Sequence, residues 1–103
     1  MCGILFVEGK TDQSTFKSSF EKIHHRGPDM SRILTNPLGT FGFHRLAIMD
    51  VTEHGMQPFI DGQIMAVCNG EIYNEHAIKA TFPDYPFQGH SDCEVLIPMY
   101  ERY

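Results

Sequence analysis

The sequence has no long hydrophobic run and few basic residues. A membrane-spanning helix needs about 20 consecutive apolar residues, whereas the N-terminal apolar run ends at Val7 and is followed by Glu8. That run also lacks a basic flank, so it does not resemble a signal peptide. Eight lysines and arginines stand against 13 aspartates and glutamates, without a basic cluster, which argues against nucleic acid or a membrane as the main partner.

Cysteine is scarce as well. Three cysteines without the spacing of a disulfide framework are typical of a reducing compartment, and we expect a cytoplasmic protein. The histidines show no zinc-ligand spacing relative to Cys68 or Cys93, so we expect no metal site. A length of 103 residues, with 42% hydrophobic and 20% charged residues, fits one globular domain.

Hydrophobic periodicity predicts strands and helices along the chain. Phe16 and Phe20 lie at helical spacing behind a candidate cap at Thr11 or Asp12, and Asp61-Gly62 is the strongest hairpin signal. The expected strands cover residues 3–7, 31–34, 40–49 and 64–68, and the expected helices cover residues 11–24 and 74–80.

A further helix is expected after Ser91, because Ser91 and Glu94 match a capping box. Pro98 conflicts with a regular helix, so we expect a kink or an early end there. The chain stops at this helix without a glycine cap or a polar tail, which suggests a fragment of a larger domain. The apolar side of the helix would consist of Val95, Leu96 and Met99.

The chain begins Met1-Cys2-Gly3, so removal of Met1 would leave Cys2 with both a thiol and a free α-amine. A thiol attacks as its thiolate, and an α-amine, with an ordinary pKa near ~8, can serve as the base. Cys2 would then be a nucleophile that carries its own base. The alternative is a small apolar residue at the start of a buried strand.

Four further residues could bind a substrate or its reaction intermediate. Asn69 and Gly70 offer a side-chain amide and an accessible backbone N–H for an oxyanion, or they form an ordinary turn. Arg45, on an apolar strand, could bind an α-carboxylate through its guanidinium fork, or pair with an internal acid. Asp92, in the first turn of a helix, could hold an ammonium group or only complement the helix dipole.

Taken together, the stretches MCGI, HHRGPD, GFHRLAIMD, QPF, CNGEIYN and SDCEVL resemble, in this order, the class II glutamine amidotransferase domain. HRGPD and SDCEV are most similar to glutamine-hydrolysing asparagine synthetases. The resemblance implies an N-terminal-nucleophile hydrolase with an α+β fold, an αββα sandwich of antiparallel sheets with helices on the outer faces. Residues 1–103 would be the N-terminal part of this domain, so the sandwich would be incomplete, and no synthetase domain is expected.

The resemblance also implies a reaction. Glutamine would be hydrolysed to glutamate and ammonia through a γ-glutamyl thioester on Cys2, with Asn69 and Gly70 forming the oxyanion hole. The segment His25–Asp29 would be a structural or gating element. The implied substrate-binding residues are Arg45 for the α-carboxylate, Glu71 and Asp92 for the α-ammonium, and Leu46 and Ile48 for the pocket wall.

Finally, the resemblance implies partners. L-glutamine would be the substrate, and a synthetase domain or a second chain would complete the fold and use the ammonia to make asparagine. The glutaminase half-reaction would need no cofactor, while ATP and magnesium would serve only the absent synthetase domain. The alternative is a truncated, catalytically inactive remnant that binds glutamine or associates with a partner, because a missing scaffold weakens preorganisation.

Overall fold

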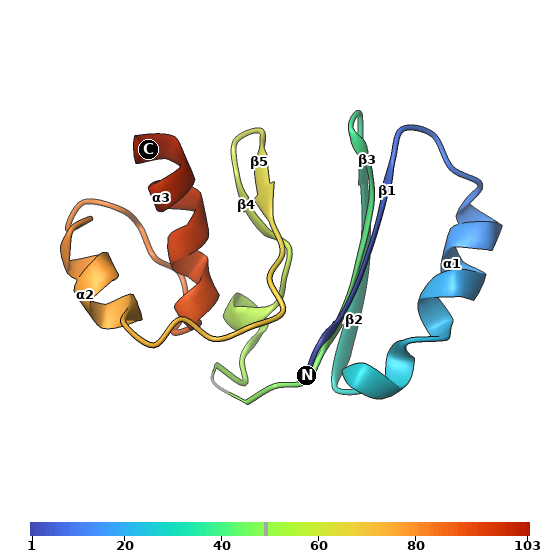
Figure 1. Cartoon of the computed structure of the whole chain (residues 1–103), viewed down its shortest axis with the longest axis horizontal. Helices are drawn as coiled ribbons and strands as arrows, with labels where there is room; N and C mark the ends of the chain where they lie inside the picture. Colours follow the sequence, from blue (N-terminus) through green and yellow to red (C-terminus); the bar gives the residue numbers. More distant parts are fainter. Residues whose placement is uncertain (49) are drawn as a thin grey trace. The chain divides into compact units, whose positions relative to one another are not determined.

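Three antiparallel strands form the sheet of the first of two units (Figure 1). β1 (Gly3–Glu8) and β2 (Met30–Asn36) both pair with β3 (Gly39–Arg45), which lies between them. β2 extends the predicted strand at both ends. The computed structural model describes residues 1–48 and 50–103, and the chain divides into the units Met1–Ala47 and Ile48–Tyr103.

Helix α1 (Gln13–Glu21) covers one face of this sheet (Figure 1). Phe16 and Phe20 are the buried residues of the helix, and they face Gly42 of β3. A Cβ added at Gly42 would lie 2.7 Å from the Phe20 ring. The Phe20 ring also stacks on the buried His44 ring, with 3.6 Å between the ring centroids. Glycine at this position of the strand therefore lets the helix pack closely.

The helix begins at the predicted Asp12 cap, whose carboxylate accepts a first-turn backbone N–H at 2.8 Å. It ends at Glu21, three residues before the predicted end, and a 3-10 turn, η1 (His24–Arg26), follows. The Phe20 carbonyl accepts the Ile23 N–H at 3.1 Å and also the ring N–H of the distant His44 at 2.9 Å. Local bonding after Phe20 thus changes to the tighter i→i+3 pattern, which is common at helix ends.

Strand β3 ends at Arg45, so the predicted strand over residues 40–49 is too long, and Met49 lies outside the described residues. The backbone N–H groups of Leu46 and Ala47 donate to side chains. Because a ladder requires these groups to pair with a neighbouring strand, the strand cannot continue through them.

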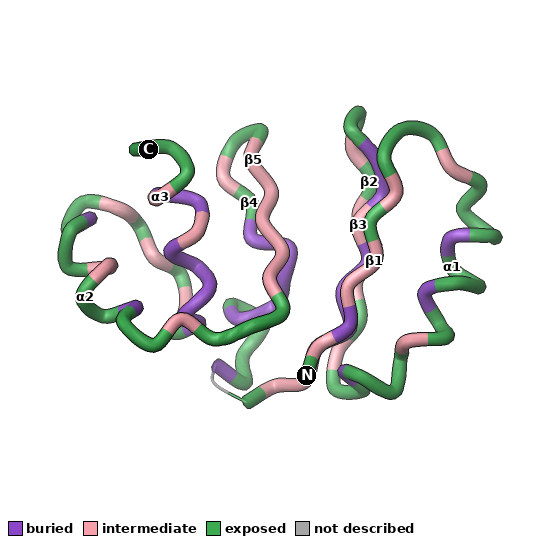
Figure 2. Tube along the Cα trace, in the orientation of Figure 1, coloured by how far each residue is buried: buried purple, intermediate pink, exposed green. Residues whose placement is uncertain are grey.

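The second unit is built around the predicted hairpin of β4 (Phe59–Asp61) and β5 (Ile64–Ala66). Gly62 occupies the turn with φ of +59°, a conformation that glycine adopts without steric cost. Helix α3 (Leu96–Arg102) packs against the hairpin, and Figure 2 shows buried stretches along α3. A buried cluster of this unit contains Phe59, Cys93 and Ile97.

Three short elements complete the second unit. The 3-10 turn η2 (Glu53–Gly55) precedes the hairpin. Helix α2 (Glu75–Ala80) is shorter by one residue than the predicted helix over 74–80 and contacts a second 3-10 turn, η3 (Asp92–Val95). This turn leads directly into α3.

The predicted capping box is wrong. Ser91 precedes η3, but its side chain makes no capping hydrogen bond. The Glu94 carboxylate accepts the backbone N–H groups of Gln88 and Gly89 instead of returning to the cap. The local spacing was suitable, but a nearby loop supplies the donors.

Pro98 does not cause an early end, because α3 continues to Arg102. It occupies the third position of the helix, where a backbone N–H would have no intrahelical partner. Of the predicted apolar side, Val95 is buried, Leu96 and Met99 are half-buried, and the buried Ile97 was not predicted.

The predicted α+β class with antiparallel sheets is confirmed. Among the described helices, none is long and apolar enough to cross a membrane.

Candidate functional site

The half-buried Cys2 lies immediately before β1. The antiparallel register pairs Gly3 with His44, which brings Cys2 to the end of β3. There the Leu46 N–H donates to Cys2 Sγ at an N···S distance of 3.3 Å. The Cys2 thiol also lies 3.8 Å from the Leu46 carbonyl oxygen. Both polar backbone groups of Leu46 thus contact the sulfur and fix its position at the end of β3.

The segment His25–Asp29 binds both the backbone at Cys2 and the backbone that follows β3. Arg26 Nε donates to the Cys2 carbonyl at 3.1 Å, and the Asp29 carboxylate accepts the Ala47 N–H at 2.8 Å. Between them, a Cβ added at Gly27 would lie 2.2 Å from the His44 carbonyl oxygen. The segment thus fixes the N-terminus against the end of β3, which gives its expected structural role a physical basis.

Arg45 is the last residue of β3 and is buried, with 5% of its surface exposed. Its guanidinium lies 3.6 Å from Met30 Sδ, on the strand position paired with it. Leu46, the next residue, is half-buried. A buried guanidinium requires compensating partners, and these contacts restrict where its fork can point.

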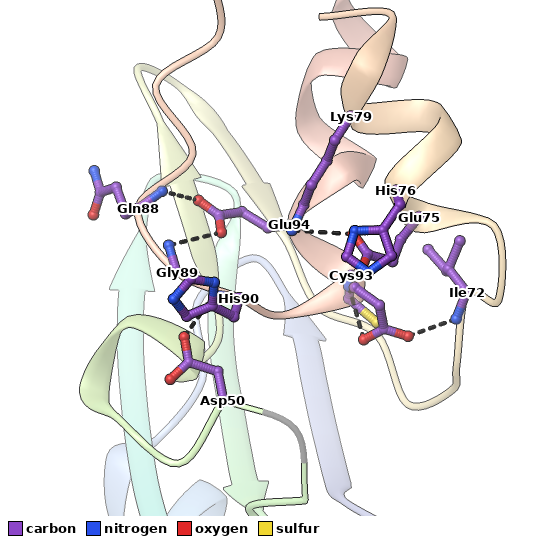
Figure 3. Close-up of polar contacts among 11 residues, drawn as sticks. Asp50, Ile72, Glu75, His76, Lys79, Gln88, Gly89, His90, Cys93 and Glu94 are labelled. Carbon is purple, nitrogen blue, oxygen red and sulfur yellow. Dashed lines mark hydrogen bonds and ion pairs between the residues drawn. The ribbon is translucent and has the colours of Figure 1, made fainter. Parts of the chain in front are cut away.

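In the second unit, Asn69, Gly70 and Glu71 form an exposed stretch after β5. Asp92 opens η3 and is buried, with 6% of its surface exposed. Its carboxylate accepts the Ile72 N–H at 2.5 Å and the Cys93 N–H at 3.0 Å (Figure 3). Asp92 therefore ties the end of the exposed stretch to the 3-10 turn.

Cys93 adds a second tie, because its thiol donates to the Gly70 carbonyl at 3.6 Å. Burial, followed by the hydrogen bond with Cys68, raises the pKa of the Cys93 thiol far above its usual range. Cys93 therefore stays protonated and serves as a donor and a core residue, not as a nucleophile.

Gln57 is a contributor to the site that sequence reasoning missed. Its side-chain oxygen accepts the Cys68 N–H at 2.6 Å, and the side chain is buried. This contact fixes the backbone one residue before Asn69. Gln57 belongs to QPF, one of the six stretches on which the resemblance rests, but the sequence does not show its contact with Cys68, 11 residues away.

The structure gathers the predicted residues in two groups. Cys2, Arg45 and Leu46 come together in the first unit. In the second unit, Cys93 contacts both Gly70 and Asp92. Ile48 is exposed and begins the second unit. Over residues 1–48 and 50–103, no three histidine, cysteine or acidic side chains are grouped so that they could hold a metal ion.

Comparison with known proteins identifies the family to which this chain is similar. The family model described as a glutamine amidotransferase domain matches residues 1–103. The glutamine-hydrolyzing asparagine synthetase 2 of Oryza sativa subsp. japonica is 42% identical over 110 residues, which cover 100% of this chain and 18% of that protein.

Two further relatives come from distant sources. A probable glutamine-hydrolyzing asparagine synthetase of Acanthamoeba polyphaga mimivirus is 38% identical, covering 97% of this chain and 20% of the relative. The glutamine-hydrolyzing asparagine synthetase 2 of Bacillus subtilis (strain 168) is 36% identical, covering 99% and 15%. The chain thus spans about a fifth of the length of the curated relatives that it matches. Because the family match extends over every residue, the chain belongs to the glutamine amidotransferase domain family.

Proposed function

We propose that this chain is the N-terminal part of a glutaminase domain in an asparagine synthetase-like enzyme. It would hydrolyse L-glutamine to glutamate and ammonia, and an ATP-dependent synthetase partner would use the ammonia to make asparagine. The family match and the named relatives support the general role. The observation that carries the proposal is the Cys2 thiol, held at the start of β1 by the Leu46 N–H at 3.3 Å.

The proposed reaction begins after Met1 is removed, when the new α-amine takes the proton of the Cys2 thiol. The sulfur then forms a bond to the side-chain carbonyl carbon of glutamine, whose oxygen becomes an oxyanion. The Asn69 amide and the Gly70 N–H donate to this oxyanion. Proton transfer from the α-ammonium to the amide nitrogen releases ammonia and leaves a thioester.

Water then attacks the thioester, and the Cys2 thiol leaves as glutamate forms. The same amine acts as the base for this water. These steps exchange only protons and acyl groups, so the half-reaction requires no cofactor of the chain itself. ATP and magnesium would serve the synthetase partner.

The remaining residues recognise the amino-acid end of glutamine. Arg45 would bind the α-carboxylate, since a guanidinium fork matches a carboxylate geometrically. Asp92 and the exposed Glu71 would receive the α-ammonium. Leu46 and Ile48 would line the path of the aliphatic chain.

The test is covalent labelling of the 103-residue chain with a diazoketone analogue of glutamine, followed by intact mass and peptide mapping. We expect one adduct on an N-terminal Cys2. Cys2→Ser should lose the adduct, whereas Cys68→Ser should keep it. An adduct that persists in Cys2→Ser would overturn the nucleophile assignment. A folded chain that lacks Met1 and remains unlabelled would favour the inactive glutamine-binding remnant.

Turnover tests the individual roles. Cys2→Ala should abolish ammonia release, and a residue retained before Cys2 should do the same because the amine no longer belongs to Cys2. Arg45→Ala should raise the KM for glutamine by roughly tenfold to hundredfold, as expected for a lost hydrogen bond to a charged group. Normal turnover with a blocked N-terminus, or an unchanged KM in Arg45→Ala, would contradict the respective role.

A further inference from the structure

Two carboxylates hold the three residues Gln88–His90, which lie shortly before Asp92. Glu94 accepts the Gln88 N–H at 2.6 Å through one oxygen and the Gly89 N–H at 3.1 Å through the other. Asp50 accepts the next N–H, that of His90, at 2.7 Å (Figure 3). Three successive backbone donors are thus bound by side chains that lie 44 positions apart in sequence.

Both carboxylates are buried, with 5% of Asp50 and 6% of Glu94 exposed. A buried charge is costly unless donors compensate it, and hydrogen bonds to a charged acceptor are stronger than those between neutral groups. Asp50 also accepts the Thr52 N–H at 2.9 Å and the Thr52 hydroxyl. The Thr52 hydroxyl, followed by the His90 N–H, keeps the pKa of Asp50 far below its usual range.

Little space is left between this segment and Asp50. A Cβ added at Gly89 would lie 2.5 Å from Asp50 Oδ2 and 3.0 Å from the Cβ of His54. A side chain at residue 89 would therefore collide with Asp50 and His54, so the close approach of this segment to Asp50 requires glycine.

The same region contains Asp92, whose oxygens bind the Ile72 and Cys93 N–H groups. Glu94 belongs to the same 3-10 turn as Asp92, so Glu94 links that turn to the segment preceding it. We propose that Asp50 and Glu94 are positioning residues that set the Asp92 carboxylate against the loop following Gly70. The inference rests on the proposed function only in assigning Asp92 to the substrate ammonium.

Glu75 offers a matched control in the same unit. It is also a buried carboxylate, with 5% exposed, but it pairs with Lys79 at 3.1 Å and His76 at 3.0 Å (Figure 3). These partners belong to its own helix, α2. Replacing Glu75 therefore removes a buried carboxylate without releasing Gln88–His90.

The first measurement is amide hydrogen exchange in the 103-residue chain, for Glu94→Ala, Glu94→Gln, Asp50→Asn and Glu75→Gln. In Glu94→Ala we expect exchange at Ile72 and Cys93 to accelerate by roughly tenfold or more, beyond any change shared with residues of β4 and β5. Glu94→Gln keeps one acceptor and should show a smaller increase. Glu75→Gln should leave Ile72 and Cys93 protected. Unchanged exchange at Ile72 in Glu94→Ala, or an equal change in Glu75→Gln, would overturn the positioning role.

The second measurement is steady-state glutamine hydrolysis by the same variants. We expect Glu94→Gln and Asp50→Asn to raise KM about tenfold with a change in kcat below about twofold, because ground-state placement of the ammonium partner is affected. An unchanged KM together with accelerated exchange would overturn the link to substrate binding. If the unmodified chain does not hydrolyse glutamine, the proposed function fails, and the exchange experiment still decides the positioning of Asp92.

Discussion

In the unit Met1–Ala47, strand pairing positions the candidate site residues. In the unit Ile48–Tyr103, buried side chains that accept backbone hydrogen bonds position them. Cys2 meets Leu46 because β1 and β3 pair in a fixed antiparallel register. Asp92 meets the loop after Gly70 because its own carboxylate binds backbone N–H groups. The first arrangement depends on backbone pairing over many residues, and the second on a few charged contacts.

This difference has physical consequences. The backbone groups of a strand ladder do not titrate, so the ladder is insensitive to pH. Because interiors are close-packed, a side chain added against its backbone is costly. Carboxylate contacts can adjust more easily to a local substitution, and they are lost when the carboxylate is protonated. The two units should therefore respond differently to added volume and to acid.

The largest effect is expected from Gly27→Ala in the first unit, compared with Gly89→Ala in the second. The alanine Cβ would meet the His44 carbonyl oxygen at 2.2 Å and the Arg45 carbonyl carbon at 2.6 Å, both in the backbone. We expect Gly27→Ala to cost about 3 kcal/mol of unfolding free energy and Gly89→Ala about 1 kcal/mol, because the nearest obstacle to the latter is the end of the Asp50 side chain. Urea denaturation measures the unfolding free energy of both variants. A greater loss of stability in Gly89→Ala than in Gly27→Ala would contradict the expected difference between the two units.

An intermediate effect is expected from Asp50→Asn, measured at neutral and acidic pH. The pKa of Asp50 is lowered from 3.8, chiefly by the Thr52 hydroxyl, so the folded state binds its proton less readily than the unfolded state. Its contribution is therefore fully present above about pH 4 and is lost as pH falls toward the lowered pKa. We expect Asp50→Asn to be about 2 kcal/mol less stable at pH 7 and to show a weaker acid dependence than the unmodified chain.

Asp12 provides the matched substitution in the first unit. Its pKa is also lowered, by hydrogen bonds with Thr15, but Asp12 is exposed and caps α1. Asparagine is about as good an N-cap as aspartate, so Asp12→Asn should change the urea midpoint little at pH 7. A larger loss in Asp12→Asn than in Asp50→Asn would show that acidic contacts are no more important in the second unit.

The smallest effect on stability is expected from Tyr85→Phe. Burial, followed by a hydrogen bond with Asp61, raises the pKa of Tyr85 to about 12. The neutral phenol therefore contributes stability below its ordinary pKa of 10.0, and this contribution is lost as pH rises through about 12. Tyr85→Phe should cost about 1 kcal/mol at pH 7.

Ultraviolet titration of tyrosinate formation checks this assignment. Tyr85→Phe should remove a transition near pH 12, whereas replacement of the exposed Tyr73 by phenylalanine should leave that transition in place. A transition near pH 12 that survives in Tyr85→Phe would contradict the assignment.

Features that depend on neighbouring residues were predictable from the sequence. Asp61-Gly62 indicated the hairpin because positive φ favours glycine, and Asp12 capped α1 as expected. The spacing of Phe16 and Phe20 identified the buried side of α1. Prediction failed where a distant group intervened, as at the end of β3, where the Leu46 N–H donates to Cys2 Sγ.

The candidate site shows the same limit. The sequence named Cys2, Arg45 and Asp92 as chemically suitable groups, and their roles in glutamine hydrolysis stay predictions. It could not show that Leu46 would donate to Cys2 Sγ, since the two residues are 44 positions apart. Nor could it show that Glu94 would bind the Gln88 and Gly89 N–H groups, because its spacing from Ser91 suggested a local capping partner.

The sequence by itself determined the family resemblance, the strands and helices, and the reactive groups available, because these depend on residue type and near-neighbour spacing. Only the tertiary structure decided which backbone donor meets which side chain: Leu46 with Cys2, Ile72 with Asp92, and His90 with Asp50. Every buried backbone N–H needs an acceptor, and packing determines which distant acceptor comes within reach.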